Sequence, residues 1–186
     1  DLSFLSFAVL IGAMIGGRLY FVLLHWSYFQ NAWHEIFFVF QGGLVLHGAL
    51  MGMAVSLWLA CKTKGWRVLP MCDLIIPYVA LAQSFGRWGC YFNGCCYGKA
   101  GIPIQLVNSL GLMLLAFLLV RMSLKSHPAG WILSFYSLGY GLLRFHTEFL
   151  RGDQTLYYFG LTHSQIISII LVLLGALGIR HLRSKT

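Results

Sequence analysis

The sequence contains six apolar runs, and each is close to the length that a helix needs to cross a lipid bilayer. They lie at about residues 2–24, 44–61, 69–85, 104–122, 131–144 with an extension to 150, and 164–179. The 186-residue chain is 59% hydrophobic and only 10% charged, which is far from the composition of soluble domains. We therefore predict an all-α polytopic membrane bundle of about six transmembrane helices, with residues 1–186 forming a single integral membrane domain.

The basic residues fall between the apolar runs rather than on one soluble face. Nucleic acid is therefore not the predicted partner, although the net charge is +8. Lysines and arginines gather at residues 62–67, 121–125 and 180–185, which are alternate ends of the predicted helices. The positive-inside rule assigns these ends to the cytoplasm. The loops at residues 26–41, 86–101 and 151–163 then face the outer side of the membrane.

Residues 86–98 place an arginine and a turn-forming, cysteine-rich loop directly after the third apolar run. A charge at membrane depth is costly and generally has a function. Irregular backbone at that depth is tolerated where protein or a water-filled cavity surrounds it. This loop is therefore a candidate site for chemistry.

Arginines at similar predicted depth could form a phosphate-binding pocket. Arg144 and Glu148 are four residues apart, and Arg151 follows three residues later, so all three share one helical face. Arg87 and Arg144 could together hold a phosphodiester, because a guanidinium binds phosphate oxygens bidentately. The ligand implied is a phospholipid. The alternative is that each arginine extends along its helix to the headgroup region.

Two further residues near the outer side have open interpretations. Arg18, near the outer end of the first apolar run, could contact a headgroup or simply reach the interface. His47 follows a glycine-rich stretch at residues 41–52. It could act as a base or donate to phosphate, or it could be a structural histidine. The glycines themselves are more typical of close helix packing.

Cys90, Cys95 and Cys96 also lie on the predicted outer side. Their spacing is not a usual zinc motif, and adjacent cysteines rarely both bind one ion with good geometry, so we predict no metal. A disulfide among them and direct involvement as nucleophiles both stay open. The remaining interpretation is that they are small apolar fillers.

In several segments the chain resembles the bacterial prolipoprotein diacylglyceryl transferases, collinearly over most of its length. Gly17-Arg18-Leu19-Tyr20 is similar to the family's Gly-Arg-x-x-Tyr, residues 42–52 to its Gly-Gly-x-x-x-His-Gly-x-x-x-Gly, and residues 73–77 to its Asp-x-x-x-Pro. Residues 86–98 correspond to the family signature, residues 140–151 to its Tyr-Gly-x-x-Arg-x-x-x-Glu-Phe-x-Arg, and residues 162–166 to the start of its last helix.

The resemblance implies an enzyme that moves diacylglyceryl from phosphatidylglycerol to the cysteine thiol of a lipobox prolipoprotein, with no metal or organic cofactor. The predicted catalytic residues are His47, Arg87 and Arg144. The predicted substrate-binding residues are Arg18, Tyr20, Asn93, Gly98, Glu148 and Arg151. Within these sets, Arg87 and Arg144 hold the phosphate, His47 acts as base or phosphate donor, Tyr20 and Asn93 orient the headgroup, and Glu148 positions Arg144.

The chain also departs from the family pattern. Cys90 and Cys95 stand where the family signature has Asn and Glu, and the loop at residues 99–103 is too short for the family's external head. Two other functions are therefore weighed. One is a related transferase with the same lipid donor and a smaller acceptor, and the other is a non-catalytic lipid-binding membrane protein.

Overall fold

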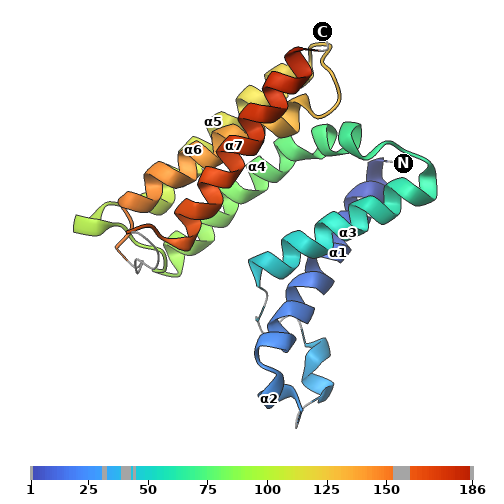
Figure 1. Cartoon of the computed structure of the whole chain (residues 1–186). Coiled ribbons are helices and arrows are strands. Elements are labelled where there is room, and N and C mark those ends of the chain that lie inside the picture. Colours follow the sequence, from blue (N-terminus) through green and yellow to red (C-terminus); the bar gives the residue numbers. More distant parts are fainter. Residues whose placement is uncertain (1, 31–32, 39–42, 44, 153–159, 185–186) are drawn as a thin grey trace. The chain divides into compact units, whose positions relative to one another are not determined.

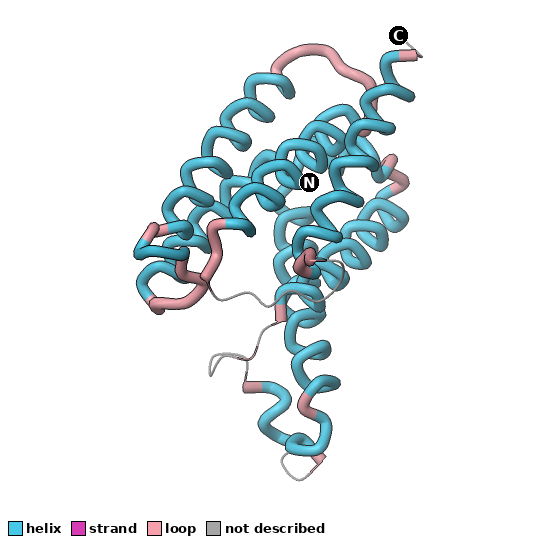
Figure 2. The backbone as a smooth tube through the Cα atoms, turned by 60° about the vertical axis from the view of Figure 1, so that its left-hand side comes forward, coloured by secondary structure: helices cyan, strands magenta, loops and turns pink. Residues whose placement is uncertain are grey.

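The structure, a computed structural model, describes residues 2–30, 33–38, 43, 45–152 and 160–184. Every regular element in these residues is helical (Figure 1, Figure 2). In chain order the elements are α1 (Leu2–Leu24), α2 (Trp26–Phe29), the 3₁₀ helix η1 (Trp33–Phe37), α3 (Leu46–Lys64), α4 (Val68–Phe92), the 3₁₀ helix η3 (Lys99–Gly101), α5 (Ile104–Ser123), α6 (Trp131–Phe149) and α7 (His163–Arg183). The predicted all-α class is confirmed.

Each of the six apolar runs forms one long helix, but the predicted number of membrane crossings is only partly supported. Among the described residues, four helices are both long and apolar enough to span a bilayer: Ser3–Leu24 of α1, and α4, α5 and α7. Helix α3 ends with two lysines, and α6 carries an arginine, a histidine and a glutamate in its last two turns. These polar residues lower the hydropathy of α3 and α6, so six crossings stay a prediction.

The predicted loop at residues 86–98 is wrong in its first half, because α4 continues through Phe92. Gly86 and Gly89 cost the helix some stability, but single glycines do not end a helix. Trp88 and Phe92, one turn apart, also contact each other with ring centroids 6.3 Å apart. The irregular segment therefore begins only at Asn93. The predicted outer loop at residues 26–41 likewise contains α2 and η1 among its described residues.

The chain falls into two compact units, Asp1–Val68 and Leu69–Thr186. In the first unit, α1 and α3 lie side by side (Figure 1). A Cβ atom on Gly16 or Gly48 would overlap a backbone atom of the facing helix, and Gly52 meets Gly12 in the same way. These glycines allow the two backbones to approach closely, which is the usual role of small residues between membrane helices.

In the second unit, α6 packs against α5 and α7. The buried apolar core of this unit contains Ala80 of α4, Ala116 and Leu119 of α5, and Ile132 of α6. Close approach of α6 and α7 again depends on a glycine, because a Cβ on Gly141 would lie 2.8 Å from the Ser168 carbonyl oxygen. The prediction that residues 1–186 form a single membrane domain stays a prediction.

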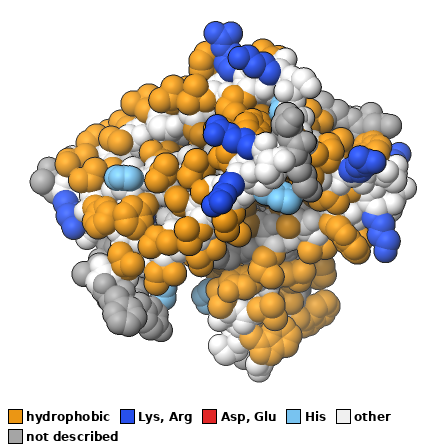
Figure 3. All heavy atoms as spheres, turned by 45° about the horizontal axis from the view of Figure 1, so that its top comes forward, with side chains coloured by type: hydrophobic (Ala, Val, Ile, Leu, Met, Phe, Trp, Pro, Cys, Tyr) orange, Lys and Arg blue, Asp and Glu red, His pale blue; other side chains and the backbone are white. Residues whose placement is uncertain are grey.

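Large apolar side chains cover much of the surface, as Figure 3 shows for one face. Phe7 of α1, Leu114 of α5 and Leu173 of α7 each expose more than half of their area. A water-soluble monomer rarely leaves so many large apolar side chains uncovered. With the four long apolar helices, this surface marks the protein as a multi-pass membrane protein.

Candidate active site

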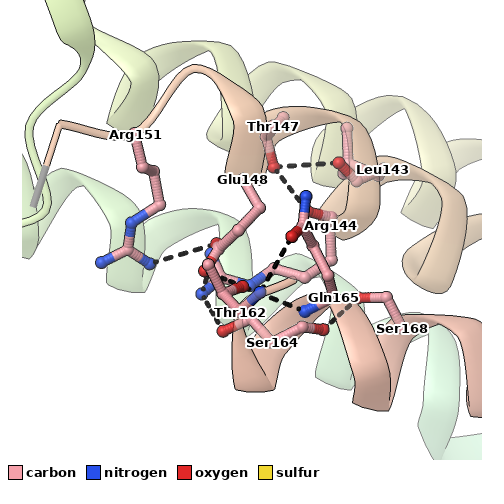
Figure 4. Close-up of polar contacts among 9 residues, drawn as sticks. All are labelled: Leu143, Arg144, Thr147, Glu148, Arg151, Thr162, Ser164, Gln165 and Ser168. Atoms are coloured by element: carbon pink, nitrogen blue, oxygen red, sulfur yellow. Dashed lines mark hydrogen bonds and ion pairs between the residues drawn. The ribbon is translucent and has the colours of Figure 1, made fainter. Parts of the chain in front are cut away.

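A buried ion pair on α6 forms the centre of the candidate site (Figure 4). The Arg144 Nη2 atom lies 3.1 Å from Glu148 Oε2, and the two residues are one helical turn apart, as their spacing predicted. Only 14% of the Arg144 side chain and none of the Glu148 side chain is exposed. Burying two charges requires further polar partners around them.

The start of α7 supplies those partners. The Thr162 hydroxyl donates to Glu148 Oε1 over 3.0 Å, and Arg144 Nη2 donates to the Ser164 hydroxyl oxygen over 3.1 Å. Figure 4 shows these side chains converging from the two helices. The ion pair is thus fixed between the last turns of α6 and the first turn of α7.

Thr162 holds Glu148 while it also caps α7. Its hydroxyl oxygen accepts from the Gln165 backbone N–H over 3.2 Å, and the Gln165 side-chain oxygen accepts from the Thr162 N–H over 3.0 Å. This reciprocal pair is a capping box, which defines where the helix begins. The roles of Thr162 and Ser164 were missed from the sequence, although the Thr-x-x-Gln spacing signals the cap.

Arg151 joins the same carboxylate from just beyond α6. Its Nη1 atom lies 3.7 Å from Glu148 Oε2, and its side chain is 7% exposed. Gly98 and Arg151 also form an isolated antiparallel bridge. Two flanking backbone hydrogen bonds, from Lys99 N to Leu150 O and from Gly152 N to Tyr97 O, strengthen it. The loop after α4 is therefore attached to the end of α6.

Among the described residues, the site carries more positive than negative charge. Arg144 and Arg151 share the single carboxylate of Glu148, and the Arg87 charge on α4 acts on Arg144 as a repelling neighbour. Within the described chain, the buried Nη1 atom of Arg144 has no hydrogen-bond partner. A cluster of cations with an unused guanidinium N–H is suited to an anionic group such as a phosphate.

Tyr140 lies one turn before Arg144 and is near enough to act on its charge. Its ring stacks on that of Tyr136, with centroids 5.5 Å apart and planes tilted by 13°. The Tyr136 hydroxyl in turn donates to Gln83 Oε1 of α4 over 2.9 Å. A polar, aromatic face therefore connects α4 and α6 beside the arginines. The residue types in the sequence predicted no role for these tyrosines.

The predicted site residues divide between the two units. Arg87, Asn93, Gly98, Arg144, Glu148 and Arg151 belong to the second unit, whereas Arg18, Tyr20 and His47 belong to the first. The backbone of His47 lies in the first turn of α3, and its side chain lies outside what the structure describes. Asn93 is exposed just after α4. The meeting of the two sets in one pocket stays a prediction.

Arg18 is 8% exposed, and its guanidinium binds carbonyl groups of its own unit. It donates to the backbone oxygens of Ile36 at 2.9 Å and Glu35 at 2.6 Å. Its guanidinium carbon also lies 5.6 Å and 5.5 Å from the ring centroids of Phe21 and Phe29. Arg18 thus organises the segment between α1 and α3, and its contact with a lipid headgroup stays a prediction.

Comparisons with known proteins identify the family of the chain. The family model described as prolipoprotein diacylglyceryl transferase matches residues 1–180. A phosphatidylglycerol–prolipoprotein diacylglyceryl transferase of Clostridium tetani is 38% identical over 89% of this chain and 74% of its own length. Proteins of the same name from Finegoldia magna and Gloeobacter violaceus are 34% and 32% identical, over 89% and 100% of this chain and 72% and 78% of their own lengths. The chain belongs to the prolipoprotein diacylglyceryl transferase family.

Proposed function

We propose that the protein transfers the diacylglyceryl group of phosphatidylglycerol to the cysteine thiol of a lipobox prolipoprotein and releases glycerol phosphate. The observation that carries this proposal is the buried Arg144–Glu148 pair, with further arginines near it among the described residues. Family membership supports the reaction, since the relatives are named for this donor and this acceptor.

The arginines would act on the phosphate of the lipid. Arg87 and Arg144 bind its oxygens, and the free Nη1 of Arg144 supplies a donor that no other group in the described chain uses. The leaving phosphate gains negative charge as its bond to the glyceryl carbon breaks. Fixed cationic donors stabilise such charge most in the transition state. Glu148 and Ser164 hold the Arg144 guanidinium in place for this purpose.

The acceptor sulfur would attack the glyceryl carbon that bears the phosphate ester. A C–S bond forms, the C–O bond breaks with its electron pair leaving on oxygen, and the thiol proton passes to a base. We assign the base to His47, because a neutral imidazole accepts a proton near pH 7. Tyr20 and Asn93 would orient the headgroup, with Arg18, Gly98 and Arg151 completing the substrate-binding set.

The active site would face the outer side of a bacterial inner membrane. Arg87 and Arg144 lie toward the carboxyl ends of α4 and α6. Arg121, in the last turn of α5, and Lys125, in the segment before α6, lie at the other end of α6. The positive-inside rule assigns the Arg121 end to the cytoplasm. The substrate arginines then occupy the opposite side, where exported prolipoproteins arrive.

The test is turnover of labelled phosphatidylglycerol by the purified protein in the presence of a lipobox peptide. Wild type should form diacylglyceryl-peptide and release glycerol phosphate. Loss of one charge-stabilising donor typically lowers kcat about 10²–10³-fold, so Arg144→Ala and Arg87→Ala should each lose about that much. Arg121→Ala is the matched control and should keep wild-type turnover.

Each contrary outcome has a defined meaning. Full lipid turnover by both Arg87→Ala and Arg144→Ala would refute the phosphate-binding assignment. Lipid turnover without modification of the peptide would favour a transferase with a smaller acceptor, as the short loop at residues 99–103 suggested. Lipid binding without any turnover would favour a non-catalytic lipid-binding protein.

A further inference from the structure

Three thiols meet at the end of α4 and in the turn that follows it. The Sγ atoms of Cys90, Cys95 and Cys96 all lie within 4.8 Å of one another, and all three cysteines are free. Cys95 is exposed, while Cys90 and Cys96 are half-buried. The group is therefore compact and open to an ion from solvent.

The turn after α4 explains how adjacent cysteines can point to one place. In extended backbone, neighbouring side chains point in opposite directions. Here Gly94 has φ = 65° and Cys96 has φ = 58°, and Cys96 is the one non-glycine residue with positive φ in the described part of the chain. These two left-handed residues reverse the direction of the chain. The side chains of Cys95 and Cys96 can therefore both reach one ion, which adjacent cysteines rarely do.

Backbone contacts hold this arrangement. The Cys95 N–H donates to the Cys90 carbonyl oxygen over 3.1 Å, which closes the turn onto the last residues of α4. The side-chain amide of Gln105, on α5 and only 5% exposed, donates to the Cys95 carbonyl oxygen over 2.8 Å. The buried amide thus anchors the middle cysteine from a second helix. This contact fixes the backbone from which the Cys95 sulfur projects.

We propose that Cys90, Cys95 and Cys96 bind a single thiophilic metal ion, Zn²⁺ or Cu⁺, through their three sulfur atoms. Three thiolates about 2.3 Å from a common ion lie roughly 3.8–4.0 Å from one another, which is compatible with the 4.8 Å limit seen here. Soft thiolate ligands select these two ions over harder ones. On binding, each thiol releases its proton to solvent, and with Zn²⁺ a fourth position remains for water.

The test uses the full-length protein in detergent, reduced and kept free of oxygen. Zn²⁺ and, separately, Cu⁺ are titrated against a chromophoric chelator, and Co²⁺ serves as a spectroscopic substitute because its thiolate charge-transfer band grows with the number of bound sulfurs. Wild type should bind one equivalent of Zn²⁺ or Cu⁺, and the ion that binds more tightly identifies the metal. Each of Cys90→Ser, Cys95→Ser and Cys96→Ser should weaken binding at least tenfold, as changes even to secondary contacts do.

Cys72→Ser is the matched control, because it removes a thiol from the same helix outside the group. It should keep full binding and the full Co²⁺ band. The exposed position of Cys95 makes Cys95→Ser the variant least able to disturb folding. The proposal is overturned if wild type binds no more of either ion than a variant with all three cysteines replaced, or if Cys72→Ser loses as much binding as Cys95→Ser. Neither readout depends on transferase activity, so this proposal can fail while the proposed function stands.

Discussion

Gly98 and Arg151 pair through their backbones in an isolated antiparallel bridge. The bridge places the loop after α4 beside Arg151, which follows Glu148 by three residues. Arg151 reaches back from this bridge to Glu148. The position of the loop and the position of the arginine cluster are therefore coupled.

Replacing Gly98 should disturb this coupling, because a Cβ atom there would overlap the carbonyl oxygen of Ile102. That atom belongs to the backbone and has little freedom to move. We expect Gly98→Val to lower stability by about 1–3 kcal/mol, the usual cost of overpacking, and to lower turnover. Differential scanning fluorimetry in detergent and the peptide assay measure the two effects. Gly89→Ala is the control, since a Cβ at Gly89 meets nothing within 4 Å, and equal losses in both variants would contradict the prediction.

The contribution of Thr162 to stability and turnover should come from its hydroxyl alone. Thr162→Val keeps the shape of the side chain but removes both the cap of α7 and the hydrogen bond to Glu148. Loss of a cap costs about 0.5–2 kcal/mol, and Glu148 also loses a buried partner. Turnover should fall because Arg144 is then held less firmly. Thr162→Ser restores the hydroxyl and should recover both the melting temperature and kcat, and a failure of serine to do so would show that the methyl group matters instead.

Much of the fold could be read from the chain because each long helix coincides with an apolar run. Helices α5 and α6 begin at the predicted residues, and the Gly/Pro breaks before them explain this agreement. The end of α4 was predicted too early, since glycine weakens a helix without ending it. Packing along the helix determines the residue at which α4 ends.

Local spacing also predicted the Arg144–Glu148 pair, because residues four apart on a helix are neighbours. Contacts between distant parts of the chain were beyond such reasoning. Thr162 lies fourteen residues from Glu148. The gathering of Cys95 and Cys96 with Cys90 depends on the left-handed backbone of Cys96, which no local pattern indicated. The sequence therefore indicated which side chains are charged. The tertiary structure determined which other side chains hold these charged groups in place.

The effects of replacing Arg144 and Glu148 on the free energy of unfolding should depend strongly on each other. Removing one member of a buried ion pair leaves the other charge uncompensated, which costs about 3–5 kcal/mol. We expect Glu148→Gln and Arg144→Gln each to destabilise the protein, and the double variant to lose clearly less than the sum of the two. Chemical unfolding in detergent gives the coupling free energy. Additive losses would mean that the two side chains act independently, contrary to their 3.1 Å contact.

Asp73 of α4 should stabilise the start of α6 from outside that helix. Its carboxylate accepts from the Gly130 N–H over 2.6 Å and the Leu133 N–H over 2.8 Å, and the residue is 3% exposed. In Asp73→Asn at most one of these bonds survives, and the other N–H stays buried without a partner at a cost of about 1–3 kcal/mol. The melting temperature should fall accordingly. His127→Gln is the control: its ring is 3.9 Å from the carboxylate and partly exposed, so it should change stability by less than about 1 kcal/mol. Equal melting temperatures for Asp73→Asn and wild type would show that water replaces the lost acceptor.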